Sequence, residues 1–181
     1  MQVQVLRSSL YLFILVRIAM GLDILFINPG SATASYQGLA SEFSAVEPPT
    51  WALLLSESVR SVGYRAAILD VNAELLSLSQ AAEKISESNP RLICLVVYGQ
   101  NPNSGTVNMV GAVALANYIK RSGINTPICA VGSHISALPK QVLSREPAID
   151  FVLCNEGVYA LRNVLACNLS DMKNLRDIKG I

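Results

Sequence analysis

Four short polar segments of this chain carry residue types that suit the binding of a large neutral ligand. Glycine lets a backbone approach a ligand closely, and asparagine and serine side chains offer uncharged hydrogen-bonding groups. Such groups suit an amide-rich ligand better than a polyphosphate. Taken singly, each segment is also compatible with an ordinary turn, because glycine and asparagine are common turn formers. The segments span residues 28–35, 98–105, 132–134 and 155–157.

Side chains capable of acid–base or nucleophilic chemistry are few in these segments. His134 is the only histidine, and Cys154 follows the next apolar run, so a Cys–His pair is conceivable. The sequence supplies no third group to orient such a pair, and we predict no catalytic residue. A lone histidine is more often structural than a metal ligand, and we predict no metal site. Glu156 precedes a predicted helix, where its carboxylate would also favour the helix dipole.

The polar segments follow apolar runs that are typical of strands buried on both faces. Amphipathic or small-residue stretches between the runs are typical of helices. The predicted strands span residues 23–27, 65–70, 92–97, 127–131 and 149–153. The predicted helices span residues 50–62, 75–88, 106–121, 139–144 and 158–166.

This alternation predicts an α/β fold, a doubly wound five-stranded parallel sheet of the flavodoxin-like or Rossmann-like kind with strand order 2-1-3-4-5. Ligands of such folds bind outside the carboxyl ends of the strands. All four polar segments are therefore expected at one edge of the sheet. No G-x-G-x-x-G follows the first strand and no Walker-type loop occurs, which argues against a nicotinamide or nucleoside triphosphate site.

Composition narrows the classes of protein further. Half of the residues (51%) are hydrophobic and the formal net charge is +1, so the chain can bury a full core. No cluster of lysine and arginine occurs, and we predict no nucleic-acid partner. The four cysteines lack the close spacing of a metal or redox motif. Cys94 and Cys129 lie within apolar runs, which favours buried, reduced thiols in a cytoplasmic protein.

The first residues have a different character from the rest of the chain. An apolar run over residues 10–16 is shorter than the roughly 20 residues that span a bilayer, which argues against a membrane partner. Arg7 before the run is compatible with a signal peptide, but Arg17 interrupts the apolar region and no clear cleavage site follows. We favour an upstream extension, with Met20 as the natural start. The expected organisation is an extension (1–21), one domain (22–167) and a polar linker (168–181).

Landmarks along residues 23–166 resemble the cobalamin-binding domain that precedes many radical S-adenosylmethionine (radical SAM) enzymes. That family carries Pro-Pro, a Leu/Ala-rich helix, Gly-Tyr and a strand ending in Asp, and residues 48–54, 63–64 and 68–70 match. Its fourth strand ends in Gly-Gly-Pro-His followed by Ala-Leu-Pro, where this chain has Val-Gly-Ser-His (131–134) and Ala-Leu-Pro (137–139). Its fifth strand ends in Glu-Gly-Glu, where this chain has Glu-Gly-Val (156–158). Residues 175–181 resemble the bridge into the radical domain.

The resemblance implies that cobalamin is the cofactor and that a radical SAM domain, in cis or in trans, is the partner. The Asp-x-His-x-x-Gly signature is absent, so the cobalt is expected to lack a protein histidine from that motif. The C-x-x-x-C-x-x-C run of the iron–sulfur cluster is also absent, which implies the cobalamin module of a truncated, methyltransferase-type enzyme. The resemblance also implies that the first-strand loop and the Gly132 loop contact the nucleotide tail of the cofactor. The predicted cofactor-binding residues are Asn28, Pro29, Gly30, Ser31, Tyr98, Gly99, Asn101, Gly132, Ser133, His134, Glu156 and Gly157.

Two other functions remain open at this point. The hydroxyl-rich residues 30–35 lie where a flavodoxin binds the phosphate of flavin mononucleotide (FMN), although the loop lacks the inner glycine and flanking aromatics are not evident. A degenerate domain that binds no cofactor and serves for docking is the third hypothesis. We also expect Gly132→Val to weaken cobalamin binding, because a branched side chain would block close approach of the backbone.

Overall fold

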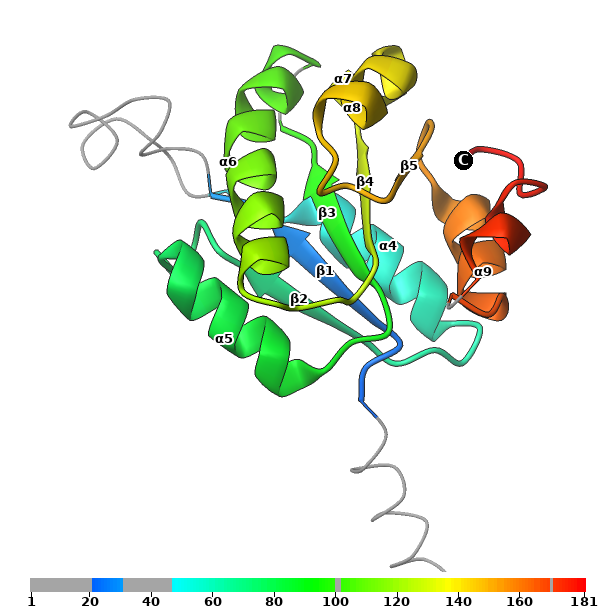
Figure 1. Ribbon diagram of the computed structural model, residues 1–181, viewed down its shortest axis with the longest axis horizontal. Helices are drawn as coiled ribbons and strands as arrows, with labels where there is room; N and C mark the ends of the chain where they lie inside the picture. Colours follow the sequence, from blue (N-terminus) through cyan, green and yellow to red (C-terminus); the bar gives the residue numbers. More distant parts are fainter. Residues whose placement is uncertain (1–20, 31–46, 100–101, 170) are drawn as a thin grey trace, which may run out of the picture.

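A computed structural model describes residues 21–30, 47–99, 102–169 and 171–181, which form a five-stranded sheet covered on both faces (Figure 1). The strands are β1 (Ile24–Asn28), β2 (Ala66–Asp70), β3 (Ile93–Val97), β4 (Ile128–Gly132) and β5 (Phe151–Leu153). Every neighbouring pair is parallel, and the order is β2-β1-β3-β4-β5. The predicted fold class and strand order are confirmed.

Helices cover both faces of the sheet. One face carries α5 (Leu78–Ser88), α6 (Pro102–Arg121), α7 (Ser133–Ala137) and α8 (Pro139–Arg145). The opposite face carries α4 (Thr50–Arg60) and α9 (Val158–Ala166). Helix α4 lies opposite α5 and α6 because crossovers are right-handed and the β1–β2 connection runs in the opposite direction to the β2–β3 and β3–β4 connections. No helix of the described ranges combines the length and the apolar character that crossing a membrane requires.

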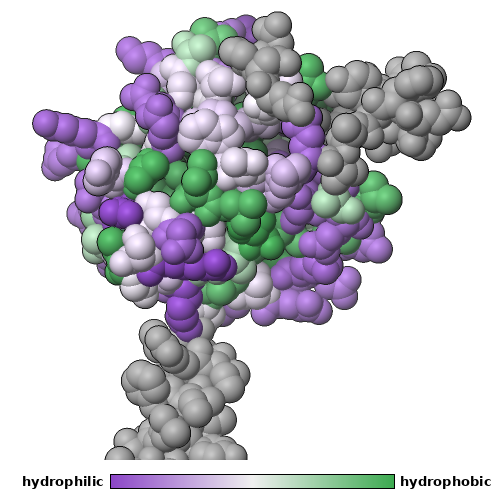
Figure 2. Space-filling model, turned by 180° about the vertical axis from the view of Figure 1, so that it is seen from behind, coloured by the Kyte–Doolittle hydropathy of each residue, from purple (hydrophilic) through white to green (hydrophobic). Residues whose placement is uncertain are grey.

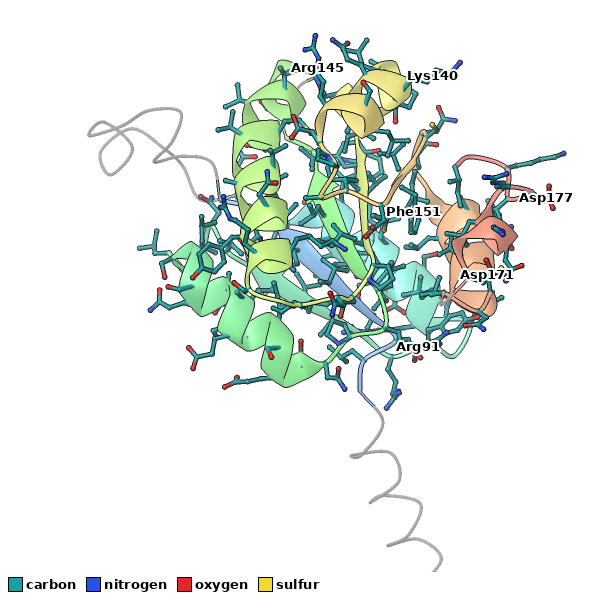
Figure 3. The ribbon with its side chains drawn as sticks, in the orientation of Figure 1. Arg91, Lys140, Arg145, Phe151, Asp171 and Asp177 are labelled. Carbon is teal, nitrogen blue, oxygen red and sulfur yellow. The ribbon has the colours of Figure 1, made fainter. Side chains whose placement is uncertain are left out.

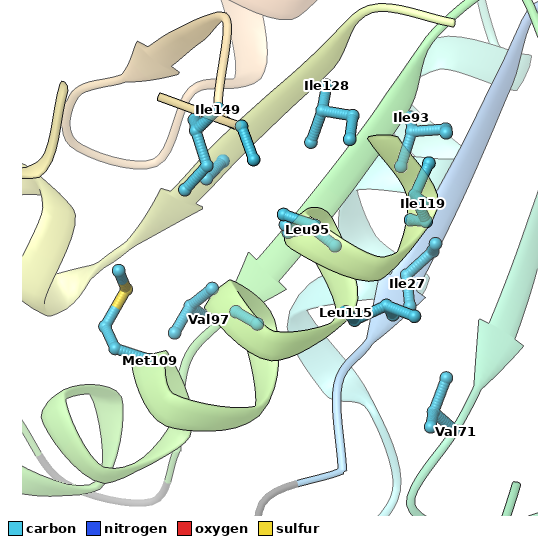
Figure 4. Close-up of a cluster of buried hydrophobic side chains, with 14 of the residues drawn as sticks. Ile27, Val71, Ile93, Leu95, Val97, Met109, Leu115, Ile119, Ile128 and Ile149 are labelled. Atoms are coloured by element: carbon cyan, nitrogen blue, oxygen red, sulfur yellow. The ribbon is translucent and has the colours of Figure 1, made fainter. Parts of the chain in front are cut away.

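Each strand contributes side chains to two separate cores, because successive side chains point to opposite faces of the sheet. Ile27 and Leu95 lie in the core beneath α5 and α6, and Figure 4 shows Leu115 and Ile119 of α6 directed at these strand residues. Phe26, next to Ile27 along β1, lies in the core beneath α4 and α9. Both faces of the sheet are therefore apolar, which explains why the strands are continuous apolar runs.

Two helices begin at positions that differ from the prediction. Helix α5 begins at Leu78 rather than at residue 75, because Ser77 and Gln80 form a capping box and Leu75 has a left-handed backbone (φ 51°). Helix α6 begins at Pro102 rather than at residue 106, because proline suits the first position of a helix, where its missing N–H costs nothing. The start of α6 thus lies within the segment that was predicted as a loop.

The carboxyl-terminal segment packs against the domain. Leu169 and Leu175 are buried in the core beneath α4 and α9, with relative exposures of 8% and 3%. A 3-10 helix, η2 (Met172–Leu175), lies within this segment, and the Cys154 amide donates to the Gly180 carbonyl at 2.8 Å. Figure 3 shows that Asp171 and Asp177 point outward, as do Lys140 and Arg145 on α8. The segment that the sequence predicted as a linker therefore covers the β5 side of the domain.

One buried hydroxyl is left without a hydrogen bond. The side chain of Ser56 on α4 is 1% exposed, and its Oγ has no partner among the described residues. Ser56→Ala is therefore expected to raise the free energy of unfolding by about 1 kcal/mol, because it removes an unsatisfied polar group and favours the helix. Ser58→Ala is the control, since the Ser58 hydroxyl accepts from Arg162 Nε at 3.0 Å, and its loss should destabilise the domain. Urea unfolding measures both, and a destabilised Ser56→Ala protein would contradict this account.

Candidate functional site

The predicted polar segments meet at the carboxyl edge of the sheet. Because the strands are parallel, residues 28–30, 98–99, 132–134 and 155–157 all follow or end strands that point to the same side. Of the twelve predicted site residues, Ser31 and Asn101 lie outside the described residues. The other ten lie at this edge, as the topology predicts. Their role in binding stays a prediction.

At the end of β1, the Asn28 side chain is hydrogen-bonded to the neighbouring strand, β2. Its Nδ2 donates to Asp70 Oδ1 at 2.9 Å, and the Ala73 amide donates to the same oxygen at 3.0 Å. Asp70 thereby orients Asn28 and holds the turn after β2. Pro29 is buried and Gly30 is half-buried. This corner of the edge is fixed by neutral groups around one carboxylate.

At the end of β3, Tyr98 joins three elements. Its ring stacks on Trp51 of α4, with centroids 4.4 Å apart and planes 20° apart. Its hydroxyl donates to the Asn155 carbonyl at 2.9 Å, and its own carbonyl accepts from Asn108 Nδ2 at 2.8 Å. The sequence predicts a helix that contains Trp51 but does not indicate that this helix brings an aromatic ring to the site. The signal that was missed is the position of the only tryptophan at the start of the helix that follows Pro48-Pro49.

Burial, reinforced by the negative charge of Glu156, raises the pKa of Tyr98 to about 12. An unfolded tyrosine ionises near pH 10, so the folded domain holds this proton more tightly. The stabilisation is complete below about pH 10 and is lost as the pH rises from there towards about 12. We expect an ultraviolet titration of the wild type minus that of Tyr98→Phe to show ionisation well above the pH near 10 that is usual for an unfolded tyrosine. Ionisation of Tyr98 near pH 10 would contradict this.

At the end of β4, the backbone passes very close to its neighbours. A Cβ at Gly132 would collide with the Val97 carbonyl oxygen, and one at Gly105 would collide with Ser133 Oγ. Helix α7 follows β4 directly, so Ser133 and His134 lie in its first turn rather than in a loop. This close packing joins the start of α6 to the start of α7.

His134 takes part in the same junction. Its Nδ1 lies 3.0 Å from Thr106 Oγ1, at the start of α6. The histidine thus hydrogen-bonds to a threonine rather than to Cys154. No group of three or more His, Cys, Asp or Glu side chains that could hold a metal ion occurs among the described residues. The geometry favours a structural role for His134.

At the end of β5, two residues with positive φ form a tight turn into α9. Asn155 has φ 56° and Gly157 has φ 67°, and Gly157 is the N-cap of the helix. A Cβ at Gly157 would approach Leu153 and Val131 at 3.2 Å. Glu156 is exposed and α9 has no side-chain cap, so its carboxylate makes no capping hydrogen bond.

The site glycines differ in what requires them. Gly99, Gly132 and Gly157 are required by the protein's own packing or backbone angles, as the distances from a built Cβ show. At Gly30 a Cβ would make only ordinary contacts of 3.5 Å or more. A Gly132→Val variant would therefore disturb the fold itself, and any effect on a ligand would be secondary.

The donor set of this edge fits a large, amide-bearing ligand. None of the four polar segments contains a lysine or an arginine. The polar groups are amides, hydroxyls, backbone groups, one imidazole and one exposed carboxylate. Such a set can hold a neutral ligand by hydrogen bonds, but offers no cation for a polyphosphate.

The fold is that of a doubly wound α/β domain, a class of protein in which ligands bind at the carboxyl ends of the strands. Residues 36–165, well over half of the chain, match the family described as the B12 binding domain. The chain therefore belongs to the B12-binding domain family. The predicted cofactor, cobalamin, is confirmed, and so is the predicted resemblance to a cobalamin-binding domain.

Two kinds of relative support this placement. The chain is 23% identical over 162 residues to an anaerobic magnesium-protoporphyrin IX monomethyl ester cyclase from Cereibacter sphaeroides, covering 87% of this chain and 24% of that protein. It is similar in fold to TsrM from Kitasatospora setae, a radical S-adenosylmethionine methyltransferase. The TsrM structure with cobalamin and a four-iron–four-sulfur cluster gives a TM-score of 0.60 at 14% identity, covering 81% of this chain and 24% of that one. The structure with tryptophan and a SAM analogue gives 0.59 at 14% identity, covering 79% and 25%. The chain thus spans about a quarter of the length of these relatives.

Proposed function

We propose that this chain holds cobalamin at the carboxyl edge of its sheet and presents it to a radical SAM domain supplied in cis or in trans. The observation that carries the proposal is the B12-binding family match on a fold whose polar segments, which contain no lysine or arginine, converge at that edge. The residues proposed to hold the nucleotide tail are Asn28, Gly30 and the backbone around Gly132. When bound, cobalamin supplies the reactive cobalt centre, and the protein supplies binding and orientation.

The cysteines support a division of labour between this chain and a second domain. Cys94 and Cys129 are buried in the sheet, where they pair in register, and burial raises the pKa of Cys129 well above its usual range. Cys154 and Cys167 lie apart from them at the end of β5 and after α9. No C-x-x-x-C-x-x-C run occurs in the sequence, so we propose that the cluster belongs to the partner domain. Four free thiols are typical of a protein that functions in the reducing environment of the cytoplasm.

The carboxyl terminus supports the same proposal. The Gly180 carbonyl is bonded to the Cys154 amide, at the ligand edge. Figure 1 shows the C-terminus beside β5. A domain attached there would begin next to the cofactor. We propose that residues 168–181 bridge to the radical SAM domain, and that the whole enzyme is of the methyltransferase type.

Purification with hydroxocobalamin and, separately, with FMN tests this function. We expect a corrinoid absorption spectrum that stays with the protein through gel filtration, and no bound flavin. The Trp51 and Tyr98 rings are only 4.4 Å apart, which leaves no room for an isoalloxazine between them. Retention of FMN alone would overturn the proposal in favour of a flavin carrier. Retention of neither chromophore would favour a docking domain.

A further inference from the structure

A rigid aromatic pair lies at the proposed ligand edge. Trp51 lies in the first turn of α4 and Tyr98 follows β3, so the two rings meet where the carboxyl ends of the strands face outward. Both residues are half-buried rather than enclosed. Ala52 and Leu55 of the same helix, by contrast, are fully within the core. Part of the Trp51 side chain therefore stays accessible at the rim of the proposed cofactor site.

The pair is held in place before any ligand arrives. Hydrogen bonds to Asn155 and from Asn108 fix Tyr98 at both its hydroxyl and its backbone carbonyl. Trp51 is fixed by stacking on that ring. A preorganised surface loses little conformational entropy when a ligand binds, which is how rigid aromatic side chains contribute to affinity.

Among the residues that the structure describes, the indole N–H of Trp51 has no hydrogen-bond partner, whereas the N–H of a buried tryptophan usually has one. Figure 2 shows apolar side chains gathered over the face that α4 covers, where Leu53 and Leu54 are 50% and 58% exposed. Unlike those leucines, Trp51 stacks on Tyr98, which follows β3 at the carboxyl edge.

Resting on the proposed function, we infer that the Trp51–Tyr98 pair is an aromatic platform that contacts a flat part of bound cobalamin. Cobalamin offers two such parts, the corrin ring and the dimethylbenzimidazole of its nucleotide tail. Contact with either one buries apolar area against the indole and brings the N–H within reach of amide oxygens on the ligand. The platform is a binding element of the site and takes no part in chemistry.

Isothermal titration of hydroxocobalamin into the wild type, Trp51→Ala, Trp51→Phe and Leu54→Ala tests the platform. We expect Trp51→Ala to weaken the Kd by about tenfold, as for loss of one stacking partner, and Trp51→Phe by much less. Leu54→Ala, an exposed change one turn along the same helix, should bind as the wild type does. Circular dichroism melts establish that each variant is folded. Repeating the titrations with cobinamide, which lacks the nucleotide tail, separates the two parts of the ligand.

A loss for cobalamin alone places the platform against the tail, and a loss for both ligands places it against the corrin. Trp51 is the only tryptophan, so its fluorescence reports the contact directly, and cobalamin should quench it strongly. Equal Kd values for the wild type and Trp51→Ala, or unquenched fluorescence at saturation, would overturn the platform while leaving cobalamin binding intact. Absence of binding by the wild type would instead remove the proposed function.

Discussion

Replacing Gly132 with alanine is expected to lower the free energy of unfolding by about 3 kcal/mol. The added Cβ would collide with the carbonyl oxygen of Val97, and this atom belongs to the backbone of the neighbouring strand, which pairs in register with Gly132. Backbone in the centre of a sheet cannot move aside as the end of a flexible side chain can. Gly132 has an extended φ of 164°, so the penalty comes from the collision and not from backbone strain. Urea denaturation of the purified variant measures the loss.

Gly30→Ala is the matched control for this prediction. It adds the same methyl group at the same edge, but the nearest atom of Asn72 lies 3.5 Å from the built Cβ. We expect a change within about 0.5 kcal/mol, as for most substitutions without a steric conflict. If Gly132→Ala proved as stable as Gly30→Ala, the close approach of β4 to β3 would be wrong.

Leu175→Ala should cost about 2–4 kcal/mol, which is the usual range for a buried leucine. Leu175 is 3% exposed and packs in the core beneath α4 and α9, although it lies in the segment whose composition predicted a linker. The loss of stability has two contributions, the lost burial of apolar surface and the cavity that remains. A fall in the urea midpoint without a change in slope would show that stability alone has changed.

Lys173→Ala within the same 3-10 helix provides the comparison, because its side chain is exposed. It should leave stability nearly unchanged. Should Leu175→Ala match Lys173→Ala, the segment would be a detached linker. The pair of variants therefore separates packing on the domain from mere attachment to it.

The fold was predictable because its strands are buried on both faces. Runs such as residues 92–97 leave no polar position for a solvent face, and their alternation with helices admits few topologies. The start of α5 was predicted at residue 75 instead of Leu78, although Ser77 and Gln80 have the spacing of a capping box. The packing of residues 168–181 against the domain could not be predicted, because a few apolar residues in a polar stretch do not show which surface covers them.

The site was predictable in place but not in detail. Parallel strands bring their carboxyl ends together, so the sequence positions of Tyr98 and Gly132 were enough to assign them to one edge. The reason for glycine at position 132 depends on the register that sets it opposite Val97. The stacking of Trp51 on Tyr98 depends on where α4 crosses the sheet. Contacts of this kind arise from three-dimensional packing, which residue types along a chain do not encode locally.

Hydrogen exchange of backbone amides with and without hydroxocobalamin tests the location of the cofactor most directly. The account predicts slower exchange on binding in residues 28–30, 98–99, 132–137 and 154–158, at the carboxyl edge. The opposite ends of the same strands, residues 21–24, 90–92 and 124–127, should exchange as before. Protection confined to the opposite ends, or to neither edge, would contradict the account.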